Sequence, residues 1–115
     1  MTFKEKLTGI SNKLEFELSI AKYCAEIQDA MEAAAHSNYR TFQIEIVRLL
    51  GNSSFSKATA ENCYSILSTA KPEKMSLIVN KVKDCICQLG FNYNDIESTP
   101  IKSSMYHAVV LKVEW

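Results

Sequence analysis

The last eleven residues, MYHAVVLKVEW, restrict the fold of this chain more than any other stretch. Apolar side chains occupy alternate positions, and the positions between them are also apolar until Lys112 and Glu114. Alternation of β-branched and aromatic residues predicts a strand over 105–115, and apolar residues on both sides predict that it lies inside a sheet. A strand that closes the chain must find its neighbours earlier in the sequence.

A long amphipathic helix is predicted at the other end of the chain. Thr2 to Glu5 has the form of a capping box, so the helix begins at residue 3 and runs to about residue 35. Gly9 and Ser11 to Asn12 weaken it, which leaves open whether the helix is continuous or kinked there. One apolar stripe consists of Phe3, Leu7, Ile10, Leu14, Leu18 and Ala21, and a second of Phe16, Ile20, Tyr23, Ile27, Ala30 and Ala34.

The two stripes lie beside each other and together predict an apolar face wider than a two-stranded coiled-coil seam. A helix laid across a sheet is the favoured interpretation. The alternative is that part of this face is a surface for self-association.

The rest of the chain divides at residues that end helices and strands. Asn38 is expected to adopt the left-handed conformation after the first helix, and Gly90 to close the last one. The predicted elements are a strand over 39–47, a loop over 51–54, a helix over 56–70 capped by Ser56, a helix from Pro72 to Leu89, a strand over 91–96 and a loop over 97–104.

These elements predict one α+β domain over residues 1–115, in the order αβααββ. A three-stranded, mostly antiparallel sheet is packed on one face by the long N-terminal helix and two further helices. The last two strands are expected to form a hairpin, which places the strand 105–115 between 91–96 and 39–47.

Charge and cysteine content predict a cytoplasmic protein. The 13 basic and 13 acidic residues give a formal charge of zero, so no overall field attracts nucleic acid or an anionic membrane. No apolar run approaches the roughly 20 residues that span a bilayer, and charges interrupt the first eleven residues where a secretory signal would be apolar. Cys24, Cys63, Cys85 and Cys87 have no paired C-x-x-C spacing and are expected to stay reduced.

The sequence contains few groupings of residues that are typical of catalytic sites. The histidines His36 and His107 and the four cysteines are too scattered for a metal site, so no metal or cofactor is predicted. His107 together with Cys85 or Cys87 is the one arrangement that resembles a nucleophile and its base, and we expect His107 to pack on the sheet instead. Three glycines leave no phosphate-binding loop. No catalytic residue is predicted, and the chain is not expected to be an enzyme.

Protein interaction is the favoured function. The second side of the closing strand has no predicted cover, and apolar surface left uncovered in a small chain is typical of an interface. A homo-oligomer is expected, with a further protein partner of unknown identity. The candidate interface residues are Tyr106, Ala108, Val110, Ala34 and Tyr23.

Two other functions stay open. A small-molecule or nucleotide site would take its polar contacts from Tyr39, Arg40, Arg48 and His107. Nucleic-acid binding is less favoured, because the segment 57–84 carries a net charge of only +2 and lacks the aromatic residues that stack on bases. Its candidate contacts are Lys74, Lys81 and Lys83.

Three segments carry a resemblance to a known group of proteins: IQDAMEAAAHSNYRTFQIEI, CQLGFNYNDI and the ending YHAVVLKVEW. In layout they resemble small α+β proteins encoded by bacteriophages and other mobile elements. The resemblance covers about half of the chain. It implies a compact accessory protein, often oligomeric, that binds and inhibits or redirects a host component, and it brings no catalytic residues. The chain departs from the pattern at Ser37 and Asn38, where a glycine is expected, and in its extra N-terminal helix.

Overall fold

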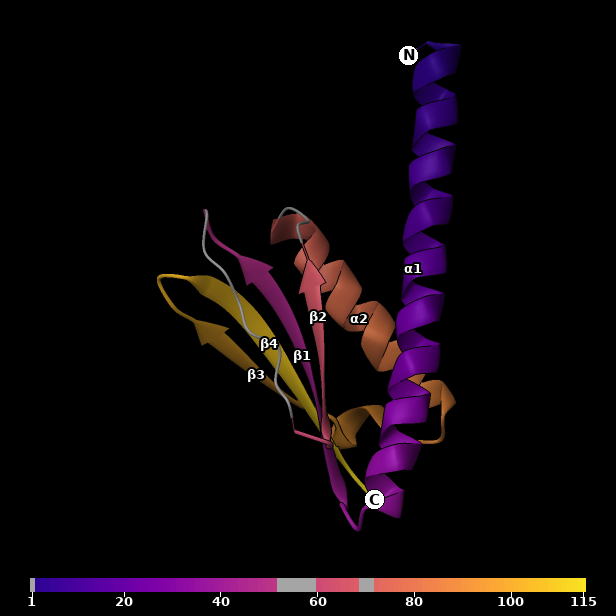
Figure 1. The fold of residues 1–115 in the computed structure, drawn as a ribbon. Helices are drawn as coiled ribbons and strands as arrows, with labels where there is room; N and C mark the ends of the chain where they lie inside the picture. The colour runs from indigo at the N-terminus through magenta and orange to yellow at the C-terminus, as the bar shows by residue number, and fades with distance from the viewer. Residues whose placement is uncertain (1, 52–59, 69–71) are drawn as a thin grey trace.

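A computed structural model describes residues 2–51, 60–68 and 72–115 and shows an α+β fold (Figure 1). The elements are α1 (Phe3–His36), β1 (Thr41–Leu49), β2 (Cys63–Ser68), α2 (Pro72–Gln88), the 3-10 helix η1 (Tyr93–Asp95), β3 (Glu97–Lys102) and β4 (Tyr106–Glu114). The predicted fold class is therefore confirmed, whereas the number and direction of the strands differ from the prediction.

The strands form one mixed sheet in the order β2-β1-β4-β3. β1 pairs in parallel with β2 and antiparallel with β4, and β3 pairs antiparallel with β4. Ile44 of β1 lies opposite Leu111 of β4, and both side chains are fully buried. The closing strand is thus an interior strand, as its apolar residues on both sides predict.

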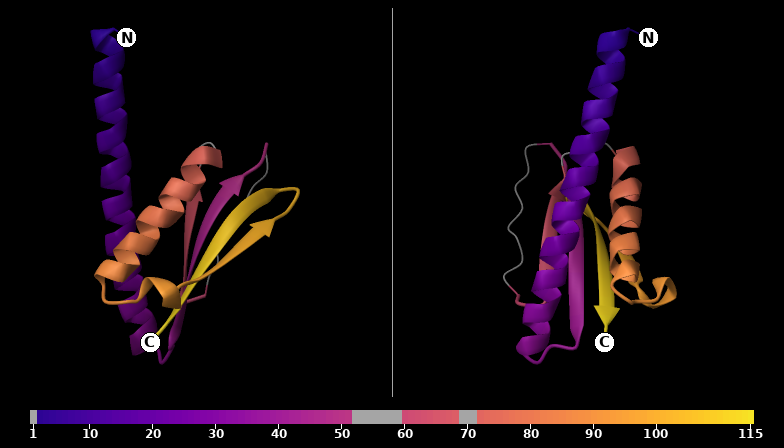
Figure 2. Two further views of the ribbon diagram at one scale, coloured as in Figure 1. Left: turned by 180° about the vertical axis from the view of Figure 1, so that it is seen from behind. Right: turned by 90° about the vertical axis from the view of Figure 1, so that its right-hand side faces the viewer.

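Both α-helices cover the same face of the sheet (Figure 2). The core between them and the sheet is built from alternate residues of the strands and from one face of each helix, because these are the positions that point inward. Its fully buried large side chains include Ile27, Phe42, Ile44, Ile46, Ile66, Val82, Ile86, Leu111 and Val113.

The predicted helix over 56–70 is wrong where the structure describes it, because residues 63–68 form β2. Ser56 and residues 69–70, like most of the predicted loop 51–54, lie outside the described residues. Tyr64 and Ile66 alternate toward the core, but the apolar residues of this segment also fit one face of a helix. Pairing with β1 decides between the two patterns. Residues 2–51, 60–68 and 72–115 therefore contain two α-helices and four strands, whereas three of each are predicted.

The predicted hairpin forms, but from a different segment. Residues 93–95, inside the predicted strand 91–96, form η1, and the predicted loop 97–104 contains β3. Pro100 is compatible with this strand because β3 lies at the edge of the sheet, where one side needs no hydrogen-bond partner. All six residues of β3 are exposed, so no burial pattern marks it in the sequence.

The helix ends agree with the sequence prediction. The hydroxyl of Thr2 accepts a hydrogen bond from the amide of Glu5 at 3.2 Å, which caps α1. Asn38 has a φ of 70°, and Gly90 has a φ of 107° after the end of α2. α1 continues through residues 9–12 without a break, which settles the question that the sequence leaves open.

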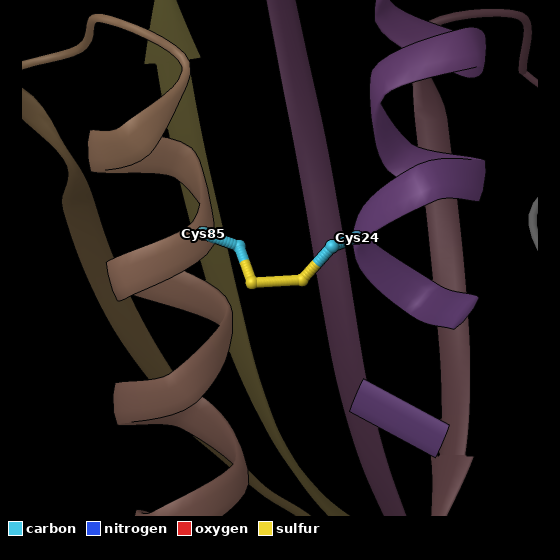
Figure 3. Close-up of a disulfide and its surroundings, with 2 residues drawn as sticks. All are labelled: Cys24 and Cys85. Carbon is cyan, nitrogen blue, oxygen red and sulfur yellow. A yellow bond between two sulfur atoms is a disulfide. The ribbon is translucent and has the colours of Figure 1, made fainter. Parts of the chain in front are cut away.

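Cys24 of α1 and Cys85 of α2 form a disulfide, with their Cα atoms 6.0 Å apart (Figure 3). The prediction that all four cysteines stay reduced is therefore wrong for this pair. The two residues are 61 positions apart, so only the packing of α1 against α2 brings them together. Cys63 and Cys87 are free thiols.

Candidate functional site

The N-terminal part of α1 extends beyond both the sheet and α2 in all three views (Figures 1 and 2). Every residue from 3 to 15 is exposed, Phe16 is half-buried, and Ile20 is the first buried residue of the helix. We call residues 3–18 the arm. At 1.5 Å per residue, the arm is about 22 Å long.

One face of the arm carries five large apolar side chains in contact with solvent. Their exposed fractions range from 48% at Leu7 to 73% at Phe3. Single exposed apolar residues are ordinary on a protein surface, whereas a continuous row of them is typical of an interaction site. We call this row, which consists of Phe3, Leu7, Ile10, Leu14 and Leu18, the arm stripe.

The arm stripe does not face the core of its own domain. The residues that α1 buries are Ile20, Ile27, Met31 and Ala34. With about 100° of rotation per residue, the centre of the arm stripe lies about 130° around the helix from the centre of this buried set. The expectation that the two stripes form one sheet-packing face is therefore wrong, and the rotation between them is the signal in the sequence that separates them.

Two contacts hold α1 in this orientation. The hydroxyl of Tyr64 in β2 donates a hydrogen bond to the carboxylate of Glu26, and the disulfide of Cys24 attaches α1 to α2. Burial, followed by the hydrogen bond and the negative charge of Glu26, raises the pKa of Tyr64 well above its usual range. Glu26 and Cys24 lie on opposite sides of the buried face, so both contacts favour the orientation in which the arm stripe points away from the core.

Charged side chains flank the arm stripe, and their sign changes along the arm. Lys4 and Lys6 lie near the N-terminal end of the arm, and Glu15 and Glu17 lie near its base, all of them exposed. Between residues 3 and 14 the arm carries three lysines and one glutamate. The arm is therefore basic at its tip and acidic at its base.

The five predicted interface residues do not form one surface. Ala34 is completely buried in the core, and Tyr23 packs against that core from α1. The other three residues point to the opposite face of the sheet. Ala108 is only 5% exposed there, and Tyr106 and Val110 are half-buried. Within its own chain Ala108 is therefore buried, whereas Tyr106 and Val110 stay partly exposed on the face that the helices do not cover.

The predicted ligand contacts form two separate groups. Tyr39 and Arg40 lie just before β1, beside a shallow cavity of about 270 Å³ that Asn38 and Trp115 also line. Arg48 and His107 are paired across β1 and β4 near the other end of the sheet, roughly 26 Å away by strand geometry.

Lys102 of β3 lies opposite His107, a neighbour that the sequence analysis does not identify. Directly opposed residues share a face of the sheet, so Arg48, His107 and Lys102 make a basic row across three strands.

The predicted nucleic-acid contacts also divide. Lys74 and Lys81 are exposed and share one face of α2 because they are seven residues apart. Lys83 points to the other side, where its ammonium lies 5.1 Å from the centre of the Tyr93 ring. The three lysines therefore do not share one face of α2.

Chemical groups for catalysis are sparse in the described part of the chain. No three histidine, cysteine or acidic side chains within it are grouped so that they could hold a metal ion. Cys85 is bonded to Cys24 and is not a thiol nucleophile. Burial, followed by the charge of Glu45, raises the pKa of the Cys63 thiol to about 11, which disfavours the reactive thiolate.

Across residues 2–51, 60–68 and 72–115, no helix combines the length and the apolar character needed to cross a membrane.

Comparison of the chain with protein-family models, curated proteins and solved structures finds no match in any of the three. The resemblance to phage-encoded accessory proteins therefore stays a prediction.

Proposed function

We propose that the chain is a non-enzymatic protein-interaction module and that the arm stripe is its binding surface. The observation that carries the proposal is the orientation of the stripe: five apolar side chains point to solvent from a helix held on its other side by the core. Their spacing of three and four residues is that of a helix that packs its apolar face into a groove or against another helix.

The weak helical propensity of the arm supports the same function. Gly9, Ser11 and Asn12 are poor helix formers, and an isolated helix of about 15 residues is only marginally stable in water. The arm has almost no contact with its own domain. A partner that covers the arm stripe would supply the apolar burial that stabilises helices in proteins.

Affinity capture with substituted arms tests this function. Leu7→Glu with Leu14→Glu places two charges on the arm stripe, and the matched control, Thr8→Glu with Asn12→Glu, adds the same charge to the polar side of the arm. A tagged chain is used to capture proteins from the lysate of cells that produce it, including untagged copies of the chain itself. We expect the stripe variant to lose its captured partners and the control to keep them. Identical capture by both variants would contradict the proposal.

A second candidate function, binding of a small anionic ligand, is favoured by the basic row of Arg48, His107 and Lys102. Titration calorimetry with inorganic phosphate and with a nucleoside triphosphate tests it. Binding that disappears in Lys102→Gln and persists in Lys74→Gln would support the candidate. The absence of any heat of binding at low salt would contradict it.

A further inference from the structure

We propose that the arm stripe pairs with the arm stripe of a second copy of this chain, in antiparallel orientation, about a two-fold axis that passes beside Ile10. This inference rests on the proposed function and identifies the partner. Three features of the arm carry it: the spacing of the apolar residues, the order of the charges, and the direction in which the stripe points.

The spacing of the arm stripe is nearly the same read in either direction. Successive members are four, three, four and four residues apart. When two arms run antiparallel about a centre between residues 10 and 11, Phe3 comes level with Leu18 of the second copy and Leu7 with its Leu14. Ile10 then meets Ile10 across the axis. Every large apolar side chain of the stripe therefore has an apolar partner, as a self-complementary two-fold interface requires.

The charges on the two flanks match in the same register. Lys4 and Glu15 lie on one flank of the arm stripe, and Lys6 and Glu17 lie on the other. A two-fold axis perpendicular to two antiparallel helices brings like flanks together. Lys4 then lies near Glu15 of the second copy, and Lys6 near its Glu17, which gives four pairs of opposite charge in the dimer.

Lys13, further around the helix from the stripe, is the charge that approaches a like charge in this register, Lys6 of the second copy. The parallel alternative is worse, because it brings opposite flanks together at the same level. Lys4 would then lie near Lys6 of the second copy and Glu15 near its Glu17. The graded charge of the arm thus favours the antiparallel arrangement, since like charges placed opposite each other are destabilising.

The domains leave room for this pairing. The tip of one arm reaches the level of Leu18 in the other copy, just before the first buried residue of α1. The arm stripe lies about 130° around the helix from the buried face, and its five side chains are exposed, so the second arm approaches them from solvent. The two sheets would stand at opposite ends of the paired arms.

Disulfide trapping tests the register. In the intact chain with Cys63→Ser and Cys87→Ser, single cysteines are introduced as Ile10→Cys, Leu7→Cys or Leu14→Cys, and the protein is mildly oxidised. We expect Ile10→Cys to form covalent dimers by itself. Leu14→Cys should form about ten-fold less, because the antiparallel register separates the two copies of residue 14 by roughly 10 Å along the helix, beyond the reach of a disulfide. A mixture of Leu7→Cys and Leu14→Cys should form heterodimers efficiently.

Efficient self-coupling of Leu14→Cys would overturn the antiparallel arrangement in favour of a parallel one. Absence of disulfide coupling at all three positions would overturn pairing between copies. That result is expected if the arm binds a different protein or a lipid surface. In that case the proposed function is judged separately by the capture experiment, in which the stripe variant is compared with the charge-matched control.

Charge reversal gives a second readout that needs no new cysteine. Lys4→Glu with Lys6→Glu should weaken dimerisation by up to about ten-fold, because four attractive contacts become repulsive while only the two contacts between residue 6 and Lys13 become attractive. Adding Glu15→Lys and Glu17→Lys to the same chain should restore it. An unchanged dimer after the first pair of substitutions, or no restoration by the second, would contradict the antiparallel register.

Discussion

The Tyr64 hydroxyl of β2 donates a hydrogen bond to the Glu26 carboxylate of α1, which connects the long helix to an edge strand of the sheet. The disulfide between Cys24 and Cys85 connects the same part of α1 to α2. Between these two contacts the buried face of α1 is held against the sheet, and the arm stripe is left on the opposite side. The exposure of the arm stripe is therefore a consequence of how the domain fixes its helix.

Loss of the Tyr64 hydroxyl should destabilise the domain. Tyr64→Phe leaves the Glu26 carboxylate without its donor, and a hydrogen bond to a charged, partly buried group contributes about 1–2 kcal/mol to the free energy of unfolding. Urea denaturation measures this loss. Tyr39→Phe, at an exposed tyrosine, is the matched control and should change the free energy of unfolding little. Equal effects of both substitutions would mean that the contact with Glu26 adds no stability.

Reduction of the disulfide should also lower the stability of the domain. The bond closes a loop of 61 residues in the unfolded chain, and the loss of this constraint typically costs about 2–4 kcal/mol. Thermal denaturation with and without a thiol reductant measures the difference. A Cys24→Ser, Cys85→Ser variant should match the reduced protein and show no response to the reductant. If the reductant also lowered the stability of that variant, the loss would not come from the disulfide.

Gly9 should be replaceable with a gain in stability of the arm. The space around it is open, so a Cβ atom meets no neighbour, and alanine is better than glycine inside a helix by about 1 kcal/mol. Gly9→Ala should increase the helical signal in circular dichroism and tighten self-association about five-fold. Gly90→Ala is the contrasting control, since its φ of 107° is strained for alanine and the variant should lose stability.

The Cys63 thiol should lose its proton only at high pH, and its pKa should depend on the charge of Glu45. Burial, and then the charge of Glu45, raises the pKa of this thiol from 9.0 to about 11. Because the folded pKa exceeds the unfolded value, the stability that the protonated thiol contributes is complete below pH 9 and is lost as the pH rises to about 11. In a Cys87→Ser chain, the pH at which alkylation accelerates should fall in Glu45→Gln and stay unchanged in Glu97→Gln. The same midpoint in both would contradict the role of Glu45.

The sequence predicts those helices and strands that are marked by patterns among residues close together in the chain. The capping residue Thr2, the left-handed Asn38 and the spacing of apolar residues predict α1 and α2, and strict alternation predicts β1 and β4. β2 and β3 are missed because each depends on pairing with a distant strand. β2 has a pattern that also fits a helix, and β3 contains Pro100 and buries no residue.

The disulfide and the arm stripe escape prediction for a related reason. The bond between Cys24 and Cys85 depends on how two helices pack, which no spacing within the chain reveals. The residues of the arm stripe are identified in the sequence, and their rotation relative to the second stripe could have separated the two faces, but the structure is needed to show which face the core uses. Two of the predicted interface residues, Ala34 and Ala108, are buried, whereas the helix face that the sequence also suggests for self-association includes the exposed arm stripe.

The molar mass of the intact chain in solution, measured by sedimentation equilibrium from about 1 µM to about 1 mM, tests self-association through the arm most directly. We predict a reversible monomer–dimer equilibrium for the natural sequence and for Thr8→Glu with Asn12→Glu. Leu7→Glu with Leu14→Glu should remain monomeric throughout the range while its sheet stays folded. A natural chain that is monomeric at every concentration, or a stripe variant that dimerises as well as the control, would contradict the account.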